Sequence, residues 1–383
     1  MDLKEKALEC HKNWNGKLET VAKSKVNSRE DLAIAYTPGV AEPCKVIAED
    51  KEAAYTYTWK SNTVAVVSDG SAVLGLGNIG PYAAMPVMEG KCVLFKEFGN
   101  VNAVPICLDT QDTEEIIEAV KNIAPGFGGI NLEDISAPRC FEIEERLKQI
   151  LDIPVFHDDQ HGTAIVVLAG IINGLRLTGK KKEGCKVVVN GAGSAGVAIT
   201  KLLLTYGFQD VTMCDREGII GKEYPNLNWM QKKMTEVTNL SQKKGTLADA
   251  LQGADIFVGV SAPNIVTPEM VASMNKDSIL FAMANPVPEI MPDVARAAGA
   301  RIVGTGRSDF PNQVNNVIAF PGIFKGALEG RATQITEEMK LAAAEALAYL
   351  VTDEQLNDEF IMPEAFDPRV ADVVSQAVKS HIK

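Results

Sequence analysis

Short apolar runs alternate with longer amphipathic segments along the middle of the chain. Residues 102–109, 128–134 and 153–159 have the apolar character of strands, whereas residues 113–124 and 138–151 have the periodicity of helices. Strands joined by helices of this length form right-handed crossovers between parallel neighbours. This part of the chain is therefore predicted to fold as an α/β unit with a parallel sheet.

A second α/β region follows a long apolar segment, residues 161–179, which we expect to form a buried helix that joins two domains. Further apolar runs predict the strands of a doubly wound sheet, at residues 185–190, 210–215, 254–261, 278–286 and 300–306. Two helices are predicted after them, at residues 335–351 and 368–382, on the outside of a cleft. A chain of 383 residues is too long for one core. We therefore predict an N-terminal α/β domain, residues 1–161, and a doubly wound domain with C-terminal helices, residues 162–383.

Glycines at the spacing G-x-G-x-x-G occur twice, at Gly75, Gly77 and Gly80 and again at Gly191, Gly193 and Gly196. Such a turn binds a dinucleotide when it follows a strand, opens a helix and has an acidic residue about 20 positions onward. The second turn meets these conditions, with Asp215 as the acid, whereas the helix after the first turn is expected to break at Pro86 and Gly90. We therefore predict a Rossmann-type NAD(P) site made of Gly191, Gly193, Ser194, Ala195, Gly196 and Asp215, with Ser261 and Asn285 from later strand ends.

Two acidic pairs stand at the carboxyl ends of neighbouring predicted strands. Glu133 and Asp134 end one strand, and Asp158 and Asp159 end the next, so all four are expected to face one crevice. Converging carboxylates repel one another unless they share a cation, and oxygen ligands favour Mg²⁺ or Mn²⁺ over zinc. Because consecutive strand residues point to opposite faces, one carboxylate of each pair is expected to lie behind the ligands. The alternative is that these acids are solvated groups at loop starts.

Two histidines, His157 and His161, flank the second acidic pair in a pattern similar to the helical H-E-x-x-H motif of zinc peptidases. In this chain the first histidine follows a strand, the acid is aspartate and a glycine comes next. The motif requires both histidines on one helical turn with a glutamate between them. The sequence therefore disfavours zinc proteolysis.

Composition narrows the choice of partners and compartment. A net charge of −12 and a pI near 5.0 oppose binding to nucleic acid. The seven cysteines are scattered, with no C-x-x-C pair, which is typical of a reducing compartment, and we expect a cytoplasmic protein. The N-terminus lacks the apolar core of a signal peptide, and no run of about 18 uninterrupted apolar residues suggests a membrane span.

Seven motifs in a fixed order give the chain a resemblance to malic enzymes of the short bacterial type. They are "AIAYTPGVAEPC", "LGLGNIGPYAAMPVMEGK", "INLEDISAPRCFEIE", "FHDDQHGTA", "GAGSAG", "AMANPVPEI" and "NNVIAFPG". The resemblance implies oxidative decarboxylation of L-malate to pyruvate and CO₂, with NAD or NADP and a divalent metal. We also expect a homodimer.

The same resemblance implies a role for individual residues. It makes Lys91 the general base with Asp158 beside it, and Tyr36 the general acid, which protonates C3 of the enolpyruvate left after decarboxylation. A lysine serves as a base when desolvation brings its pKa toward neutrality, so we expect that shift at Lys91. The implied metal ligands are Glu133, Asp134 and Asp159, and the implied substrate-carboxylate ligands are Asn285 and Asn316.

One position departs from the family pattern, because larger relatives carry an arginine where this chain has Ala72. Our hypothesis is that the amides of the turn from Gly75 to Gly80 donate to a malate carboxylate and replace part of that contact.

Three questions remain open at the level of sequence. A malolactic enzyme, which releases lactate, would use the same fold, NAD and metal, whereas a non-catalytic nucleotide sensor would need neither Tyr36 nor Lys91. NAD is favoured over NADP because Asp215 would repel a 2′-phosphate, although Arg216 stands beside it and could pair with that phosphate.

Overall fold

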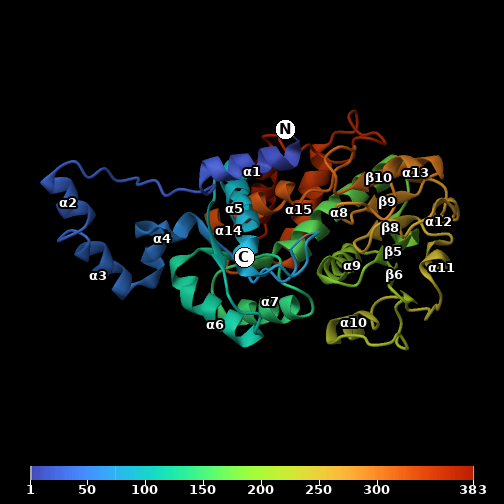
Figure 1. Cartoon of the computed structure of the whole chain (residues 1–383), viewed down its shortest axis with the longest axis horizontal. Coiled ribbons are helices and arrows are strands. Elements are labelled where there is room, and N and C mark those ends of the chain that lie inside the picture. The colour runs from blue at the N-terminus through green and yellow to red at the C-terminus, as the bar shows by residue number, and fades with distance from the viewer. Residues whose placement is uncertain (1, 74, 383) are drawn as a thin grey trace.

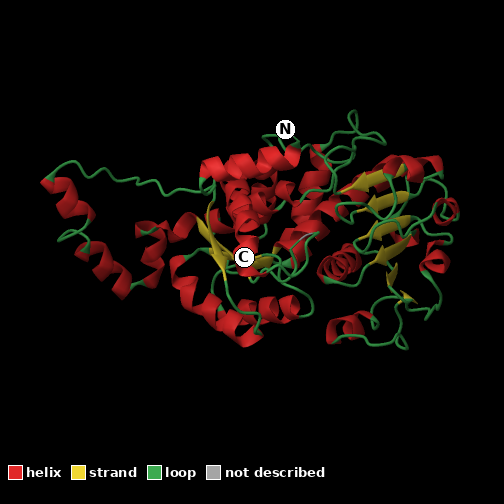
Figure 2. Ribbon diagram, viewed as in Figure 1, coloured by secondary structure: helices red, strands yellow, loops and turns green. Residues whose placement is uncertain are grey.

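The computed structural model describes residues 2–73 and 75–382, and it contains two open sheets in separate halves of the molecule (Figure 1, Figure 2). One sheet has four strands in the order β2-β1-β3-β4, and the other has six in the order β10-β9-β8-β5-β6-β7. Helices cover both sheets. The α/β fold class with two parallel-sheet halves is therefore confirmed.

The four-stranded sheet is parallel throughout and belongs to the N-terminal half. Its strands are β1 (Thr63–Ser68), β2 (Asn102–Cys107), β3 (Gly129–Leu132) and β4 (Val155–His157). The helices that cross between them are α5 (Gly80–Gly99), α6 (Thr113–Ile123) and α7 (Arg139–Ile150). Strand β1 is fully buried and lies centrally in the sheet, although the hydrophobic pattern did not lead us to predict it.

Helix α5 corrects one of our predictions, because it runs unbroken through Pro86 and Gly90 for 20 residues. A proline inside a helix costs about 3 kcal/mol through a lost hydrogen bond and a steric clash. Here Pro86 lies on the exposed face, while Ala84, Met88 and Phe95 on the other face are completely buried. Burial of that face outweighs the local penalty, so the first glycine turn, like the second, follows a strand and opens a full helix.

The six-stranded sheet has the predicted doubly wound arrangement, with one antiparallel edge strand. Its strands are β5 (Lys186–Asn190), β6 (Asp210–Asp215), β7 (Gly218–Ile219), β8 (Ile256–Gly259), β9 (Ile279–Ala282) and β10 (Ile302–Thr305). Around it lie α9 (Ser194–Tyr206), α10 (Trp229–Met234), α11 (Leu247–Leu251), α12 (Pro268–Ala272) and α13 (Pro292–Ala297). The order of the strands reverses between β5 and β8, where a parallel sheet opens a crevice at its carboxyl edge.

Helix α8 (Asp158–Thr178) leads from the first sheet to the second. By length and composition it could cross a membrane, but two thirds of its apolar window is buried inside the molecule, where it packs against α9 and α15. Its apolar character is therefore explained by its position in the core. The predicted boundary, residue 161, lies in the first turns of this helix.

The last three long helices return toward the N-terminal half. They are α14 (Phe320–Glu329), α15 (Glu337–Leu350) and α16 (Val370–Lys379). Helix α14 packs against α5, with Phe320 and Phe324 both in edge contact with Phe95, and α16 packs on α14 and α15. One hydrophobic core consequently contains side chains from both halves of the chain.

Residues 18–50 form an arm that projects from the body of the molecule, on the left of Figure 1. The arm carries α2 (Arg29–Ala35) and α3 (Ala41–Glu49), and it lies between α1 (Leu3–Trp14) and α4 (Ala54–Tyr57). Neither α2 nor α3 has a buried residue. Our sequence interpretation did not anticipate this projection.

Candidate active site

Lys91 lies on the buried face of α5 and is surrounded by acids. Its Nζ donates to Asp158 Oδ2 at 2.5 Å and to Glu133 Oε1 at 3.0 Å, and it stands 4.0 Å from the centre of the Phe320 ring. Burial by itself lowers the pKa of Lys91, but the two carboxylates outweigh it and raise that pKa above the usual lysine value. The expected shift toward neutrality is therefore wrong for this structure, because the acids stabilise the ammonium form.

The three predicted metal ligands converge beside Lys91. Carboxylate oxygens of Glu133, Asp134 and Asp159 all lie within 4.8 Å of one another. Strand β3 ends at Leu132, and Asp134 takes a left-handed conformation with φ of 54°, which no longer follows the alternation of a strand. Both acids of the first pair thus join the cluster, contrary to our expectation. In the second pair the expectation holds, since Asp159 joins the cluster while Asp158 binds Lys91.

This cluster fits a hard divalent cation. Burial, with repulsion between neighbouring acids, raises the pKa of Glu133 to about 8, of Asp134 to about 9 and of Asp159 to about 6. Asp134 Oδ2 is buried without a hydrogen-bond partner in the described part of the chain. Oxygen donors that are this close and incompletely neutralised suit Mg²⁺ or Mn²⁺.

Asp158 connects the two halves of the molecule through Asn316. The Asn316 Nδ2 donates to Asp158 Oδ2 at 3.0 Å and to Thr163 Oγ1 at 3.1 Å. A Cβ on Gly162 would lie 1.9 Å from Asp158 Oδ1, so a glycine at this position is required for the Asp158 rotamer. The structure therefore brings Lys91, the four acids and Asn316 into one site.

The first glycine turn lies against Asn285. A Cβ on Gly75 would stand 3.9 Å from the Asn285 carbonyl oxygen, which places this turn at the carboxyl end of β9. Four of its amides already donate to backbone carbonyls: Leu76 and Gly77 to Val73, and Ile79 and Gly80 to Gly70. These four amides are not available to a malate carboxylate, so our hypothesis is wrong for most of the turn.

The second glycine turn has the geometry of a dinucleotide site. Gly191 has φ of 110°, and a Cβ there would lie 2.5 Å from the Val260 carbonyl oxygen, while a Cβ on Gly196 would lie 1.7 Å from the Gly191 oxygen. Gly193 differs, because a Cβ there would meet no atom within 4 Å. Packing therefore explains the outer two glycines, and the open space at Gly193 suits the close approach of a pyrophosphate. Ser194 and Ala195 open α9 at this point.

Two residues that support the cofactor turn were missed from sequence. Gln231 Nε2 donates to the Ala192 carbonyl at 3.2 Å and to Asp215 Oδ2 at 3.4 Å, which ties the turn to the predicted ribose ligand. Glu289 is completely buried and accepts from the amides of Ser261, at 2.8 Å, and Ala284, at 3.0 Å. An acid in the apolar context of "ANPVPEI" is the one sequence signal that could have drawn attention to Glu289.

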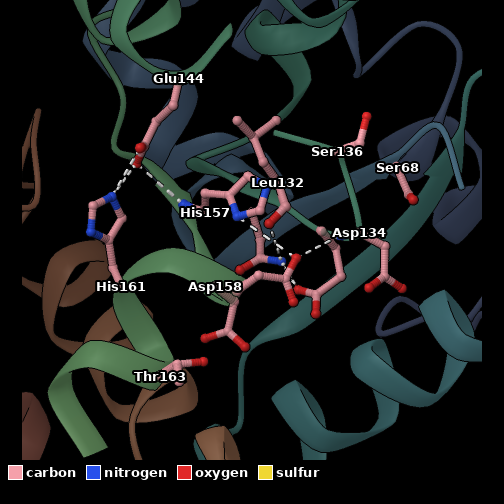
Figure 3. A network of polar contacts seen from close by, with 12 residues as sticks. Ser68, Leu132, Asp134, Ser136, Glu144, His157, Asp158, His161 and Thr163 are labelled. Carbon is pink, nitrogen blue, oxygen red and sulfur yellow. Dashed lines mark hydrogen bonds and ion pairs between the residues drawn. The ribbon is translucent and has the colours of Figure 1, made fainter. Parts of the chain in front are cut away.

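His161 belongs to a buried polar network and not to the acid cluster. Its Nε2 lies 2.8 Å from Glu144 Oε1, and its Nδ1 lies 3.0 Å from Lys340 Nζ. Because an ammonium group only donates, Nδ1 must accept and Nε2 must carry the proton given to Glu144. Burial lowers the pKa of His161 to about 4, which agrees with this neutral form. Glu144 also accepts from the His157 amide at 3.3 Å, so the network supports the junction of β4 and α8 (Figure 3).

Tyr36, the predicted general acid, is not brought to this site. It lies at the end of α2 on the projecting arm, and its side chain is 68% exposed. Its backbone hydrogen bonds run to Leu32 and Val40 of the same arm.

The structure has a Rossmann turn in one half and a lysine with clustered acids in the other. These two features are those of a two-domain, dinucleotide-dependent oxidoreductase. Family models match both halves: "Malic enzyme, N-terminal domain" over residues 15–148 and "Malic enzyme, NAD binding domain" over residues 160–381. The chain belongs to the malic enzyme family, whose members are decarboxylating oxidoreductases that use NAD or NADP.

Named relatives agree with this membership. The chain is 59% identical over 379 residues to the bifunctional malic/malolactic enzyme of Bacillus subtilis, an alignment covering 99% of this chain and 92% of that protein. It is 60% identical to the NAD-dependent malic enzyme of Geobacillus stearothermophilus, covering 95% and 76%. The crystal structure of NAD-dependent malic enzyme from Thermotoga maritima superposes with a TM-score of 0.94 at 54% identity, covering 97% and 98%. Further relatives are named as NADP-dependent malic enzymes.

Proposed function

We propose that this chain oxidatively decarboxylates L-malate to pyruvate and CO₂, with NAD as the preferred cofactor. The observation that carries the proposal is the contact of Lys91 Nζ with Asp158, at 2.5 Å, beside three acids whose oxygens lie within 4.8 Å of one another. This oxidation requires a base that accepts the proton of the malate hydroxyl and a cation that binds the hydroxyl oxygen.

The chain's own residues have separable tasks in this reaction. Lys91 would take the hydroxyl proton at Nζ once a cation on the neighbouring acids offsets the negative charge that raises its pKa, and Asp158 and Glu133 then stabilise the ammonium. Glu133, Asp134 and Asp159 are the residues that would hold Mg²⁺ or Mn²⁺. Asn316, fixed by Thr163, presents an amide to a substrate carboxylate. A metal held there would supply a Lewis acid for the C2 oxygen and for the charge released by decarboxylation, and a bound nicotinamide would supply the hydride acceptor.

The proposed preference for NAD is inferred from the acidic residue at the end of β6. Asp215 closes this strand, and its Oδ1 accepts from the amide of Arg216 at 2.9 Å, which fixes the carboxylate next to the glycine turn. A carboxylate there accepts from ribose hydroxyls and repels a 2′-phosphate. The two NAD-dependent proteins at 54% and 60% identity support the same choice.

Malolactic activity is the second candidate, because a relative at 59% identity is named as a bifunctional malic/malolactic enzyme. The two reactions share fold, cofactor and metal, and they differ in whether reduced cofactor leaves the enzyme. A site that retains the nicotinamide through decarboxylation would return the hydride to pyruvate and release lactate.

One assay separates the candidates. Malate and Mn²⁺ are supplied with NAD or with NADP, absorbance is followed at the NADH band, and pyruvate and lactate are quantified at the end. We expect NADH and pyruvate in equal amounts, with a higher kcat/KM for NAD. Lactate without NADH would establish the malolactic reaction, and cofactor binding without either product would establish a nucleotide sensor.

We also propose a cytoplasmic location. All seven cysteines are free thiols in the structure, and several are buried among apolar side chains, which suits a reducing compartment.

A further inference from the structure

A cavity separate from the active site lies between the two halves of the chain. Its volume is about 190 Å³, many times the space that one water molecule needs. Its wall is formed by α7 of the N-terminal half and by α8, α9, α10 and α15 of the rest of the chain. None of the described residues that line it belongs to the acid cluster or to the glycine turns. A molecule bound there would contact both halves at once.

Part of the cavity wall is apolar. Phe141, Ala164, Leu202 and Met230 line it, and all four are buried. These side chains can pack against a short aliphatic group, but they offer it no hydrogen bond. Sites for small molecules typically combine such a wall with a few polar groups that fix the orientation of the ligand.

Two polar side chains of the wall have hydrogen-bonding capacity that the protein does not use. Gln160 is 4% exposed, and its Nε2 is buried without a hydrogen-bond partner in the described part of the chain. Lys201 is exposed, and its ammonium group forms no hydrogen bond or ion pair with a described residue. A buried donor without an acceptor is unfavourable. The two groups together therefore indicate a ligand that supplies an acceptor.

The ion pair of Lys340 with Glu337 also has capacity left on both sides. Lys340 Nζ donates to Glu337 Oε1 at 2.7 Å and to His161 Nδ1 at 3.0 Å. An ammonium group has three donors and a carboxylate has two accepting oxygens. One N–H of Lys340 and the second oxygen of Glu337 are therefore free to contact a ligand.

The charged side chains of the wall balance one another. They are three lysines and three glutamates, and burial lowers the pKa of His161 to about 4, which keeps it neutral. Lys148 and Glu144 pair with each other at 2.7 Å, and the remaining four charges still include both signs. A ligand with a net charge would be repelled by one of the two signs, whereas a zwitterion can contact both.

We propose that this cavity binds a small aliphatic α-amino acid in its zwitterionic form. The carboxylate of the ligand accepts from Lys201, Lys340 and Gln160. Its ammonium group donates to the free oxygen of Glu337, and its aliphatic group packs against the apolar wall. The inference does not depend on the proposed function, because binding is measured without turnover.

Calorimetric titration with L-valine tests the proposal. The full chain is first saturated with NAD and Mg²⁺, so that the cofactor turn and the acid cluster are filled. Two analogues are titrated in parallel: 3-methylbutanoate, which lacks the ammonium group, and 2-methylpropylamine, which lacks the carboxylate. We expect L-valine to bind and each analogue to bind about tenfold or more weakly, because each leaves charged hydrogen-bonding groups without a partner.

A thermal unfolding series supplies a second readout, because a ligand that binds the folded state raises Tm with its concentration. L-valine that gives no heat of binding and does not raise Tm would overturn the proposal. Binding of 3-methylbutanoate as tight as that of L-valine would overturn the assignment of a zwitterion, since it would show a site for simple anions.

Two variants locate the binding site. Lys201→Met is expected to weaken L-valine binding about tenfold through the loss of a charged donor, and the exposed position keeps the fold intact. Its matched control is Lys232→Met, because Lys232 is exposed on α10 and does not line the cavity. Glu337→Gln is expected to reduce the difference in affinity between L-valine and 3-methylbutanoate, since it removes the charge that the ammonium group contacts.

These variants also decide whether the ligand binds elsewhere. Wild-type affinity for L-valine in Lys201→Met would place the amino acid outside this cavity and overturn the proposal. Equal losses in Lys201→Met and Lys232→Met would do the same, because they would reflect the net charge of the protein and not a contact in the cavity.

Discussion

Four carboxylates surround a single ammonium group at the centre of this molecule. Glu133, Asp134, Asp158 and Asp159 come from two strand ends, and Lys91 from one helix. An uncompensated charge is energetically unfavourable in a buried site. A buried carboxylate therefore either binds a proton or binds a cation. Burial raises the pKa of three of the acids, repulsion between neighbouring acids adds to this rise, and the same negative charge raises the pKa of the lysine.

Lys91→Ala is expected to reduce kcat by about 10² or more, because loss of a general base has this typical cost. The dissociation constant for NAD, measured by fluorescence titration, should stay near the wild-type value, since the glycine turn lies in the other half of the chain. Lys96→Ala is the matched control, because Lys96 is on the same helix but exposed. A Lys91→Ala enzyme that keeps more than about a tenth of wild-type turnover would exclude Lys91 as the base.

Glu133→Gln and Asp159→Asn are expected to raise the Mn²⁺ concentration needed for half-maximal activity by about tenfold or more, because an amide preserves shape but not charge. Cofactor affinity should change little. The activation constant is measured by titrating Mn²⁺ at saturating malate, with the exposed Glu115→Gln as control. An unchanged metal requirement in both variants would mean that these acids have a structural role.

Asp215→Ala is expected to weaken NAD binding by about tenfold, the usual loss when a charged hydrogen-bond acceptor is removed. NADP should lose less, because the repulsion of its 2′-phosphate is removed at the same time. Calorimetric titration of both cofactors checks this, and an unchanged NAD affinity would show that the ribose contact has been assigned to the wrong residue.

Sequence reasoning succeeded at the residues whose position follows from local rules. Strand ends in a parallel sheet meet at one edge, so the convergence of Glu133 and Asp159 could be predicted. The contacts of Gln231 with Ala192 and of Glu289 with Ser261 could not, because each joins segments that are far apart in sequence. The location of Tyr36 could not be predicted either, since it depends on where a surface segment packs.

At the level of elements, the periodicity of α6, α7 and α9 matched the helices found, whereas α5 did not. Local propensity is a weak prior that tertiary burial overrides. The apolar run around Cys92 and Phe95 faces the core, and this burial keeps α5 continuous across Pro86. Proline and glycine are therefore least reliable as indicators of a helix end where one face of the segment is fully buried.

The network on α7, α8 and α15 gives a prediction at this scale. Glu144→Gln removes the charge that Lys148 and His161 face, and it takes one of two nearby acids from the buried Lys340, which keeps its ion pair with Glu337. Breaking a buried ion pair costs about 3–5 kcal/mol, so a clear fall in Tm is expected, with weaker Mn²⁺ activation because the β4–α8 junction carries Asp159. The neighbouring exposed Glu145→Gln is the control. A wild-type Tm in Glu144→Gln would show that the network does not stabilise the fold.

At the scale of the whole molecule, the acid cluster predicts how stability depends on pH. The pKa values of Glu133 and Asp134 are about 8 and 9 in the folded protein, against 4.5 and 3.8 for unperturbed groups. Between these limits the folded state binds more protons than the unfolded state, so the free energy of unfolding falls as pH rises.

Metal-free protein is therefore expected to lose Tm between pH 6 and pH 9. Mn²⁺ competes with protons for the same oxygens, so it should raise Tm more at pH 9 than at pH 6. Scanning calorimetry with and without chelator measures both effects, with Glu133→Gln as the reference. A metal-free Tm that rises over this range would contradict the assignment of these pKa shifts.

The two sheets were predictable from the alternation of strands and helices, but the large-scale arrangement was not. Nothing in the hydrophobic pattern of residues 18–50 distinguishes an arm from an ordinary pair of helices, because its apolar positions are those of any amphipathic segment. The packing of α14 against α5 could not be predicted either, since it depends on contacts between residues more than 200 positions apart in sequence.

That return has a consequence for how the protein could be recombined. The polypeptide passes between its halves twice, once along α8 and once between β10 and α14, where Phe320 docks on Phe95. A graft that exchanges the cofactor half as one C-terminal block would separate α14 and α16 from the surface they evolved to fit. Chimaeras built to exchange nicotinamide specificity therefore need two junctions, with the intervening sheet moved as an internal cassette and the native C-terminal helices left in place.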